Sequence, residues 1–104
     1  MSYEKFVLDG KVAVLISPGY GAGWYSWNKE HEGLAFDKEL VELLLQNRKY
    51  DLVKLAEQKY PDAYVGGVDG LEVVWVDQGT QFEIDEYDGH EQLQKVWQKK
   101  ILTA

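Results

Sequence analysis

The run of apolar residues Val12–Ile16 most restricts what this chain can fold into. Alternate side chains of a strand point to opposite sides of a sheet, so an uninterrupted apolar run predicts a strand that is covered on both faces. Asp9-Gly10 separates this run from Phe6-Val7-Leu8, and an Asp-Gly pair between two β-prone segments is a strong local signal for a two-residue hairpin turn. Pro18 ends the run. We therefore expect a hairpin whose second strand lies at the centre of a sheet.

Length and composition indicate a single folded domain that spans residues 1–104. With 104 residues, 45% of them hydrophobic, the chain can bury one core and is short for a second. It contains no cysteine, which excludes disulfides, thiolate catalysis and cysteine-ligated zinc. It has no apolar window of about 18 to 20 residues, the length of a membrane span, and it does not begin with the pattern of a signal peptide. We expect a cytoplasmic protein without membrane contact.

Two helices are predicted between Asp37 and Tyr60. Asp37 is a suitable N-cap for the first helix, whose apolar residues recur with helical spacing on one face. Asp51 can cap the second helix, which should end at Tyr60-Pro61 because the residue before a proline is disfavoured in the α-helical conformation. The apolar positions are Leu40, Val41, Leu44 and Leu45 in the first helix and Leu52, Leu55 and Ala56 in the second. Together they predict a helical hairpin that covers one face of the sheet.

The C-terminal third of the chain predicts a second hairpin and a final helix. Leu71–Val76 and Gln81–Asp85 are β-prone segments that flank Asp77–Thr80. Apolar and polar residues alternate in the second of these segments, so one of its faces should meet the core. Asp88 and Glu91 resemble a capping box ahead of residues with helical spacing. The expected fold class is α+β, with a mostly antiparallel sheet of about four to five strands and a helical hairpin packed on one face.

Residues 17–28, which we name the Gly/aromatic loop, carry three glycines and four aromatic rings directly after the apolar strand. Glycine lets the backbone approach a ligand closely, and tryptophan and tyrosine offer rigid faces on which a nucleobase stacks with about 1 to 3 kcal/mol. We interpret this segment as a binding site. The candidate ligand-binding residues are Tyr20, Gly21, Ala22, Gly23, Trp24, Tyr25, Trp27 and Asn28, with Tyr64 and Tyr87 closing the pocket. The alternative is that Trp24 and Trp27 fill the core, and we expect at least one of them to do so.

The chain carries no recognisable nucleotide-binding fingerprint and no nucleophile motif. Gly19-x-Gly21-x-Gly23 follows a predicted strand, but it continues into Trp24-Tyr25. Its glycines do not have the G-x-G-x-x-G spacing of a dinucleotide site, and the Gly-Lys-Ser/Thr sequence of a P-loop is absent. Asp85–Glu91 gathers four carboxylates and one histidine, yet it lacks the EF-hand pattern, and a solvated acidic strand end explains the same residues. Glu30-His31-Glu32 is a pattern that is most common in exposed loops. We expect no catalytic residue, no metal and no cofactor.

The formal net charge of −7 argues against general nucleic-acid binding, which depends on clustered lysine and arginine. Arg48 is the single arginine, so backbone N–H groups, lysines or residues pooled in an oligomer would have to hold a phosphate. We therefore expect a homo-oligomer in which Lys11, Lys29 or Arg48 converge from neighbouring subunits. Alternatively, an acidic protein of this size can imitate DNA and occupy a basic groove.

Four stretches of the chain carry a resemblance to known sequences. They are the segment from Lys11 to Asn28, Tyr60-Pro61-Asp62-Ala63-Tyr64, Gly79-Thr80-x-Phe82 and Asp85-Glu86-Tyr87-Asp88-Gly89. On these stretches the chain resembles a group of small phage and prophage proteins of uncharacterised function. The resemblance covers residues 11 to about 89 and implies a viral or prophage origin, but it implies no particular activity.

Three functions are compatible with that origin, because small phage proteins without catalytic signatures often neutralise host defences. The leading hypothesis is a counter-defence protein that sequesters a nucleotide-derived signal through the Gly/aromatic loop, without turnover. The second is an acidic protein that docks on a basic groove of a host defence nuclease. The third is a small metal-dependent nucleotide hydrolase that uses Glu86, Asp88 and His90. The acidic residues of the second hypothesis are Glu83, Asp85, Glu86, Asp88 and Glu91.

Overall fold

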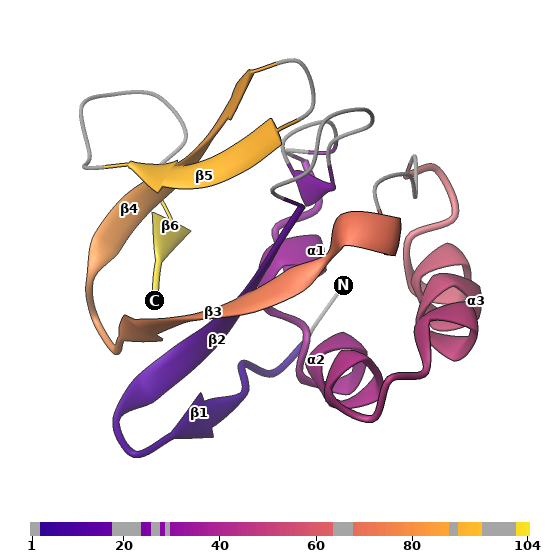
Figure 1. The fold of residues 1–104 in the computed structure, drawn as a ribbon, viewed down its shortest axis with the longest axis horizontal. Helices are drawn as coiled ribbons and strands as arrows, with labels where there is room; N and C mark the ends of the chain where they lie inside the picture. Colours follow the sequence, from indigo (N-terminus) through magenta and orange to yellow (C-terminus); the bar gives the residue numbers. More distant parts are fainter. Residues whose placement is uncertain are drawn as a thin grey trace.

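In a computed structural model, the strands of the protein form two antiparallel sheets (Figure 1). The structure describes residues 3–17, 24–25, 28, 30–63, 68–87, 90–94 and 102–104. The strands are β1 (Val7–Leu8), β2 (Lys11–Ile16), β3 (Glu72–Asp77), β4 (Gln81–Tyr87), β5 (His90–Gln94) and β6 (Leu102–Thr103). Their order is β1-β2-β3 in the first sheet and β5-β4-β6 in the second. The α+β class and the antiparallel pairing are confirmed, but the described strands form two sheets of three instead of one sheet of four or five.

The first sheet is built on the N-terminal hairpin that the sequence predicts. Asp9 has a φ of 53° and Gly10 a φ of 77°, as a two-residue type I′ turn requires, and Val7 pairs with Val12 across it. β2 pairs on its other edge with β3, from Lys11 opposite Asp77 onward. All residues of Val12–Ile16 are at most 6% exposed, so both faces of β2 are covered. The prediction of a central, doubly covered strand is therefore confirmed.

The helices α1 (Gly33–Phe36), α2 (Lys38–Leu45) and α3 (Lys49–Lys59) lie beside the first sheet (Figure 1). α1 and α2 pack against β2, and α3 packs against α2. Asp37 caps α2 as expected, because its side chain accepts a hydrogen bond from the Glu39 backbone N–H. α3 begins earlier than expected, so Asp51 lies in its first turn instead of at its cap, and α3 ends before Tyr60 as expected. The helical hairpin predicted between Asp37 and Tyr60 is present as α2 and α3.

The second predicted hairpin is wrong in its pairing. β3 and β4 follow one another in the chain, but β3 pairs with β2, whereas β4 pairs with β5 and β6. The physical reason is that β2, buried on both faces, also needs a partner on its second edge, and the valine-rich β3 supplies it. The chain therefore passes from one sheet to the other between β3 and β4.

The predicted final helix is wrong for residues 90–94, which form β5. β5 pairs with β4 in a register that places Tyr87 opposite His90, so two residues, Asp88-Gly89, separate the paired strands. Asp-Gly is also the dipeptide that predicts the first hairpin. The interpretation of Asp88 as a helix cap is therefore wrong, and a hairpin is the better prediction from the same two residues. The rest of the predicted helix, residues 95–101, lies outside the described part of the chain.

One core connects the helices with both sheets. The rings of Phe36 in α1 and Phe82 in β4 meet edge to face with centroids 6.1 Å apart, and Leu102 of β6 is fully buried in the same cluster. Phe82 and Ile84 are both buried, so β4 turns one face to the core as its alternating sequence predicts. Among the described residues, no helix combines the length and the apolar character that crossing a bilayer requires.

Candidate functional site

The described residues of the Gly/aromatic loop are buried. Trp24 is 0% exposed, Tyr25 is 1% exposed and Asn28 is 2% exposed. Trp24 therefore belongs to the core, which agrees with the expectation that at least one of the two tryptophans of the loop does so. Tyr87 lies in β4, where the structure describes the backbone. The other candidate binding residues, Tyr20, Gly21, Ala22, Gly23, Trp27 and Tyr64, lie outside the described part of the chain.

Hydrogen bonds tie the end of the Gly/aromatic loop to α1. The indole Nε1–H of Trp24 donates to the Leu34 carbonyl at 2.6 Å, and this carbonyl belongs to a helix so short that its C=O groups need partners from elsewhere. The side-chain amide of Asn28 donates to the Trp24 carbonyl at 2.8 Å, and the His31 N–H donates to the Asn28 carbonyl at 2.9 Å. These hydrogen bonds link the described residues at the end of the loop with α1 and with the residue His31 before it.

These residues line a cavity of about 240 Å³, which we name the aromatic cavity. Its described lining residues are Tyr3, Glu30, His31, Glu32, Gly33 and Tyr60. The rings of His31 and Tyr60 have their centroids 5.3 Å apart. His31 Nε2 lies 2.9 Å from an Asp62 carboxylate oxygen, and the His31 side chain is only 19% exposed. The Glu30-His31-Glu32 triplet forms part of the wall of this cavity. Glu30 is exposed, as expected of a loop, whereas His31 and Glu32 are partly buried.

Gly33 determines the shape of the aromatic cavity. A Cβ atom at this position would lie 2.8 Å from Cζ of Tyr60, closer still to the Tyr60 hydroxyl, and 3.2 Å from the Tyr3 ring. Such approaches are too short for carbon atoms, so any larger residue would displace the Tyr60 ring. The sequence offers no periodicity or motif that reveals this requirement, because Tyr3, Gly33 and Tyr60 come from three distant segments.

Tyr25 carries a buried hydroxyl, although this residue is not among those that line the aromatic cavity. Within the described part of the chain, no hydrogen-bond partner contacts this hydroxyl. Burial, and after it the negative charge of Glu32, raises the pKa of Tyr25. Burial likewise raises the pKa of Tyr3 to about 12, with further contributions from the charge of Glu32 and a hydrogen bond to it. Both phenols are therefore protonated and uncharged at neutral pH.

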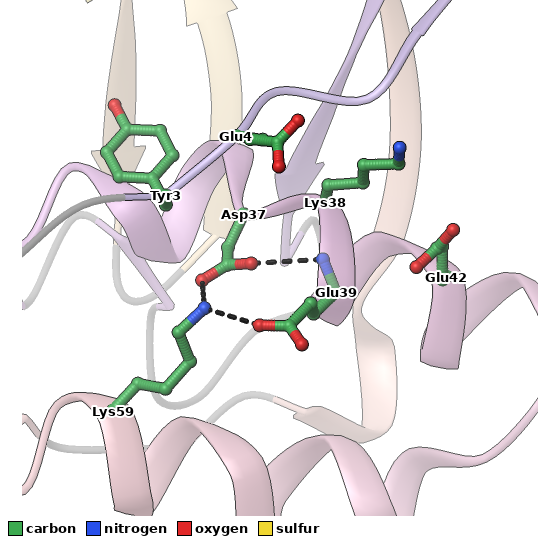
Figure 2. Close-up of a pocket in the computed structure, with 7 residues that line it drawn as sticks. All are labelled: Tyr3, Glu4, Asp37, Lys38, Glu39, Glu42 and Lys59. Atoms are coloured by element: carbon green, nitrogen blue, oxygen red, sulfur yellow. Dashed lines mark hydrogen bonds and ion pairs between the residues drawn. The ribbon is translucent and has the colours of Figure 1, made fainter.

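A second cluster of polar groups surrounds Asp37, which is 1% exposed (Figure 2). One carboxylate oxygen of Asp37 accepts the Glu39 N–H at 3.0 Å, and the other accepts the Tyr60 hydroxyl at 3.1 Å and the Lys59 ammonium at 2.6 Å. Figure 2 shows Lys59 extending from α3 to Asp37 and Glu39 at the start of α2. We name Asp37, Glu39, Lys59 and Tyr60 the Asp37 cluster.

The Asp37 cluster joins α2, α3 and the N-terminal segment. Lys5 and Asp37 form a backbone bridge, and the Lys38 N–H donates to the Glu4 carbonyl at 2.7 Å. Burial alone would lower the pKa of Lys59, but its hydrogen bonds to Asp37 and Glu39 outweigh burial and raise it. A neighbouring cavity of about 420 Å³ has Lys38 as well as Lys59 in its wall, together with Tyr3, Glu4, Asp37, Glu39 and Glu42 (Figure 2). Charges of both signs are thus present around this cavity.

The other groups considered from the sequence are dispersed. Lys11 pairs with Asp77 at 2.7 Å and Arg48 with Asp51 at 2.8 Å, both on the surface, and Lys29 lies outside the described residues. In β4 and β5, the backbone register places Glu86 opposite Glu91. Within the described ranges, no three histidine or acidic residues are grouped in a way that could hold a metal ion.

Comparison with known proteins yields no match, whether with a family model, a curated protein or a solved structure. Function therefore has to be argued from the residues and their geometry.

Proposed function

We propose that this protein binds and sequesters a nucleotide-derived molecule without converting it, as a phage-encoded counter-defence protein in the cytoplasm of the host cell. The observation that carries the proposal is the anchoring of both ends of the glycine-rich part of the Gly/aromatic loop. Ser17 at the end of β2 is 2% exposed and Trp24 is 0% exposed, so both flanks of residues 18–23 are fixed in the core.

Fixed flanks favour binding because they lower the entropy that a loop loses when it closes on a ligand. Six residues connect Ser17 with Trp24, and glycines stand at positions 19, 21 and 23. A short segment between fixed ends can adopt fewer conformations than a free chain of the same length, so less entropy is lost on ligand binding. Glycine backbone N–H groups are suited to a phosphate, and Tyr20 and Trp27 are suited to a base. In this proposal Trp24 anchors the loop in the core and does not stack on the ligand.

The described groups near the loop are suited to binding without turnover. The phenols of Tyr3, Tyr25 and Tyr60 have raised pKa values and stay protonated at neutral pH. Asp37 and Lys59 are engaged with each other at 2.6 Å. The phenols can position a ligand through neutral hydrogen bonds, and neither they nor the Asp37–Lys59 ion pair is poised to exchange protons with it.

The first test is to purify the protein from cells with an active nucleotide-signalling defence, denature it and identify released small molecules by mass spectrometry. A stoichiometric intact nucleotide is the expected result. Titration calorimetry with AMP and cyclic di-AMP should then show binding that Tyr20→Ala and Gly21→Val abolish, whereas Tyr50→Ala, at an exposed position of α3, keeps it. Unchanged affinity in the folded loop variants, or recovery of a cleaved nucleotide, would exclude this function.

The proposal includes a homo-oligomer in which Lys11, Lys29 or Arg48 come from neighbouring subunits to the phosphate. Lys11 and Arg48 are held by exposed ion pairs, which contribute about 0 to 1 kcal/mol each and can be exchanged for a ligand phosphate. Light scattering coupled to size exclusion measures the oligomer, and Arg48→Gln should weaken nucleotide binding without changing the mass. A monomer that binds nucleotide with full affinity would refute this part.

A second candidate function, inhibition of a host defence nuclease by an acidic surface, is favoured by the pairing of β4 with β5. The carboxylate residues Glu83 and Asp85 occupy the positions that alternate with the buried Phe82 and Ile84. A partner with a basic groove would recognise such a strand pair. The test is a pull-down of a host nuclease at increasing salt concentration, with the wild type and with the double variant Glu83→Lys/Asp85→Lys. Binding that falls steeply with salt and is lost in the variant would favour this candidate over sequestration. Binding that changes with neither would exclude it.

A further inference from the structure

We propose that the free edge of β1, together with the groove beside it, binds a second copy of this chain in a two-fold symmetric dimer. This dimer supplies the homo-oligomer that the proposed function includes. It forms without nucleotide, so its absence and a failure to bind nucleotide are separate results. Three features support it: unpaired backbone groups of β1, an apolar groove along the same edge, and two opposite charges on α2 that have no partner in the described part of the chain.

The backbone of Val7 faces away from the rest of its sheet. β1 is the outermost of the described strands of the first sheet (Figure 1). The Ala13 N–H donates to the Phe6 carbonyl at 2.9 Å, which makes these two residues a hydrogen-bonded pair. Such pairs alternate with non-hydrogen-bonded pairs in an antiparallel ladder, so Val7, opposite Val12, points its N–H and C=O away from β2. Neither group has a backbone partner among the described residues, and a free strand edge is a template for pairing with another chain.

A groove of about 440 Å³ follows this edge. Its described lining residues are Lys5, Phe6, Val7 and Leu8 beside β1 and Lys38 and Glu42 of α2. Side chains of consecutive strand residues alternate between the two faces of a sheet, so four consecutive lining residues place the groove along the strand edge. Val7 is 46% exposed and Leu8 is 54% exposed, so the groove offers apolar surface as well as backbone groups. An extended segment with apolar side chains therefore fits it.

The sequence around β1 is complementary to itself. In antiparallel pairing centred on Val7, the two copies of this residue exchange both backbone hydrogen bonds, and Leu8 lies opposite Phe6 of the partner subunit. The same register places Lys5 opposite Asp9 of the partner subunit, so no like charges oppose one another. A second copy thus matches this edge in both its apolar and its charged positions.

Lys38 and Glu42 make the neighbouring helix face complementary to itself as well. They lie one turn apart on α2, both line the groove, and neither side chain has an ion-pair or hydrogen-bond partner in the described part of the chain. A two-fold axis through the groove reverses the direction of α2, so that Lys38 of each copy can face Glu42 of the partner subunit. The net charge of −7 opposes self-association, but the described lining of the groove has no excess of negative charge.

The position of the dimer edge relates it to the proposed nucleotide site. Leu8 pairs with Lys11 across the N-terminal hairpin. Lys11 is one of the residues proposed to reach a phosphate held by a neighbouring subunit, and this interface brings it within one strand of the second copy. The free part of the edge is short, because Lys5 is already bridged to Asp37. Small interfaces are typical of weak association, so we expect a dissociation constant in the micromolar range.

Cross-linking through one introduced cysteine tests the proposed centre of the interface, because the chain contains no cysteine. Val7→Cys should form an intermolecular disulfide on mild oxidation, since residues of a hydrogen-bonded antiparallel pair have Cα atoms about 5.5 Å apart, within the reach of a disulfide. Tyr50→Cys, at a more exposed position of α3, is the matched control and should cross-link about tenfold more slowly or less. Equal rates in the two variants, or no cross-link in Val7→Cys, would overturn the proposal.

Sedimentation velocity measures the dimer of the unmodified protein without nucleotide. Val7→Lys places two like charges opposite one another at the two-fold axis and should raise the dissociation constant by about tenfold or more. Tyr50→Lys makes the same change at an exposed position away from the groove and should leave it within about twofold. A wild-type protein that stays monomeric at about 200 µM, as expected if the groove binds a different protein, would overturn the proposal.

Charge reversal on α2 tests the symmetry of the contact. Lys38→Glu and Glu42→Lys, both at exposed positions, should each weaken the dimer several-fold. An equimolar mixture of the two variants should restore association as a heterodimer, because one copy then presents two carboxylates and the other two ammonium groups. Recovery in the mixture also shows that both variants are folded. Wild-type association of each variant alone, or no recovery on mixing, would refute the antiparallel contact of α2.

Discussion

The Asp37 cluster and the aromatic cavity are neighbours that share Tyr60, yet the carboxylates in the two regions differ in burial and in their partners. Asp37 is 1% exposed, and both of its oxygens receive donors, including the Lys59 ammonium at 2.6 Å. In the aromatic cavity, Glu30 and Glu32 line a space of about 240 Å³ whose described wall contains no lysine or arginine, and His31 Nε2 lies 3.9 Å from a Glu30 carboxylate oxygen. The carboxylate of Asp37 is satisfied within the protein, whereas that of Glu30 is largely exposed to solvent.

A structural polar cluster differs from a candidate binding site in whether the protein itself satisfies every buried polar group. In the structural cluster the protein supplies all partners, as Glu39, Lys59 and Tyr60 do for Asp37. The Tyr25 hydroxyl, in contrast, has no hydrogen-bond partner within the described ranges. The distinction can be tested by asking which substitutions destabilise the protein and which change only its affinity.

The largest effect is expected from Asp37→Ala, which should lower the free energy of unfolding by about 3 to 5 kcal/mol. The substitution removes the cap of α2 and the hydrogen-bond acceptor of Tyr60, and it leaves Lys59 with Glu39 alone. Urea unfolding monitored by circular dichroism measures the loss. Glu42→Ala, at an exposed position of α2, is the control, and a similar effect of the two changes would show that the Asp37 cluster is not a structural centre.

A smaller loss, about 1 to 3 kcal/mol, is expected from Gly33→Ala, because the new methyl group would collide with the Tyr60 ring. A double-mutant cycle with Tyr60→Phe sharpens the test. The hydroxyl that the methyl group meets first is absent in that background, so the cost of Gly33→Ala should be smaller there. Identical costs in both backgrounds would mean that Tyr60 does not determine the choice of glycine.

Alkaline pH should destabilise the native protein by a further, gradual effect. Burial raises the pKa of Tyr3 from its ordinary 10.0 to about 12 in the folded state. The folded protein therefore holds this proton more tightly than the unfolded chain, so the contribution is complete below the ordinary pKa and is lost as pH rises toward about 12. Urea unfolding across that interval should show a shallower decline in Tyr3→Phe than in the wild type. Parallel curves would contradict the assigned shift.

Local signals in the sequence were sufficient for the parts of the fold that short segments determine. Asp9-Gly10 identifies the first hairpin and Asp37 the start of α2, since a turn or a cap depends on a few adjacent residues. The partner of β3 could not be read in this way, because its pairing with β2 joins residues about 60 positions apart, such as Ala13 and Trp75. Which strand pairs with β3 depends on burial in the whole molecule and not on the adjacent sequence.

The candidate site shows the same limit. The density of glycine and aromatic residues drew attention to Trp24, Tyr25 and Asn28, but composition cannot say which rings are covered, and all three side chains are buried. The sequence does not identify Tyr3 and Tyr60 as cavity residues, because their role depends on meeting at Gly33 across the fold. A tyrosine at the end of a helix looks the same in a sequence whether it lines a cavity or faces water.

The smallest expected effect comes from the same chemical change, loss of a phenol hydroxyl, made at Tyr60 and at Tyr25. Tyr60→Phe removes a hydroxyl that donates to Asp37 at 3.1 Å and should lower the free energy of unfolding by about 1 kcal/mol. Tyr25→Phe removes a buried hydroxyl that has no partner in the described ranges, and it should leave stability unchanged or raise it by a few tenths of a kcal/mol. Both rings are buried, so loss of ring packing does not distinguish the variants, and thermal and urea unfolding of the pair measure the hydroxyl alone. Equal destabilisation by the two changes would show that the Tyr25 hydroxyl is satisfied within the protein, and the contrast between a hydroxyl with a partner and one without would then be lost.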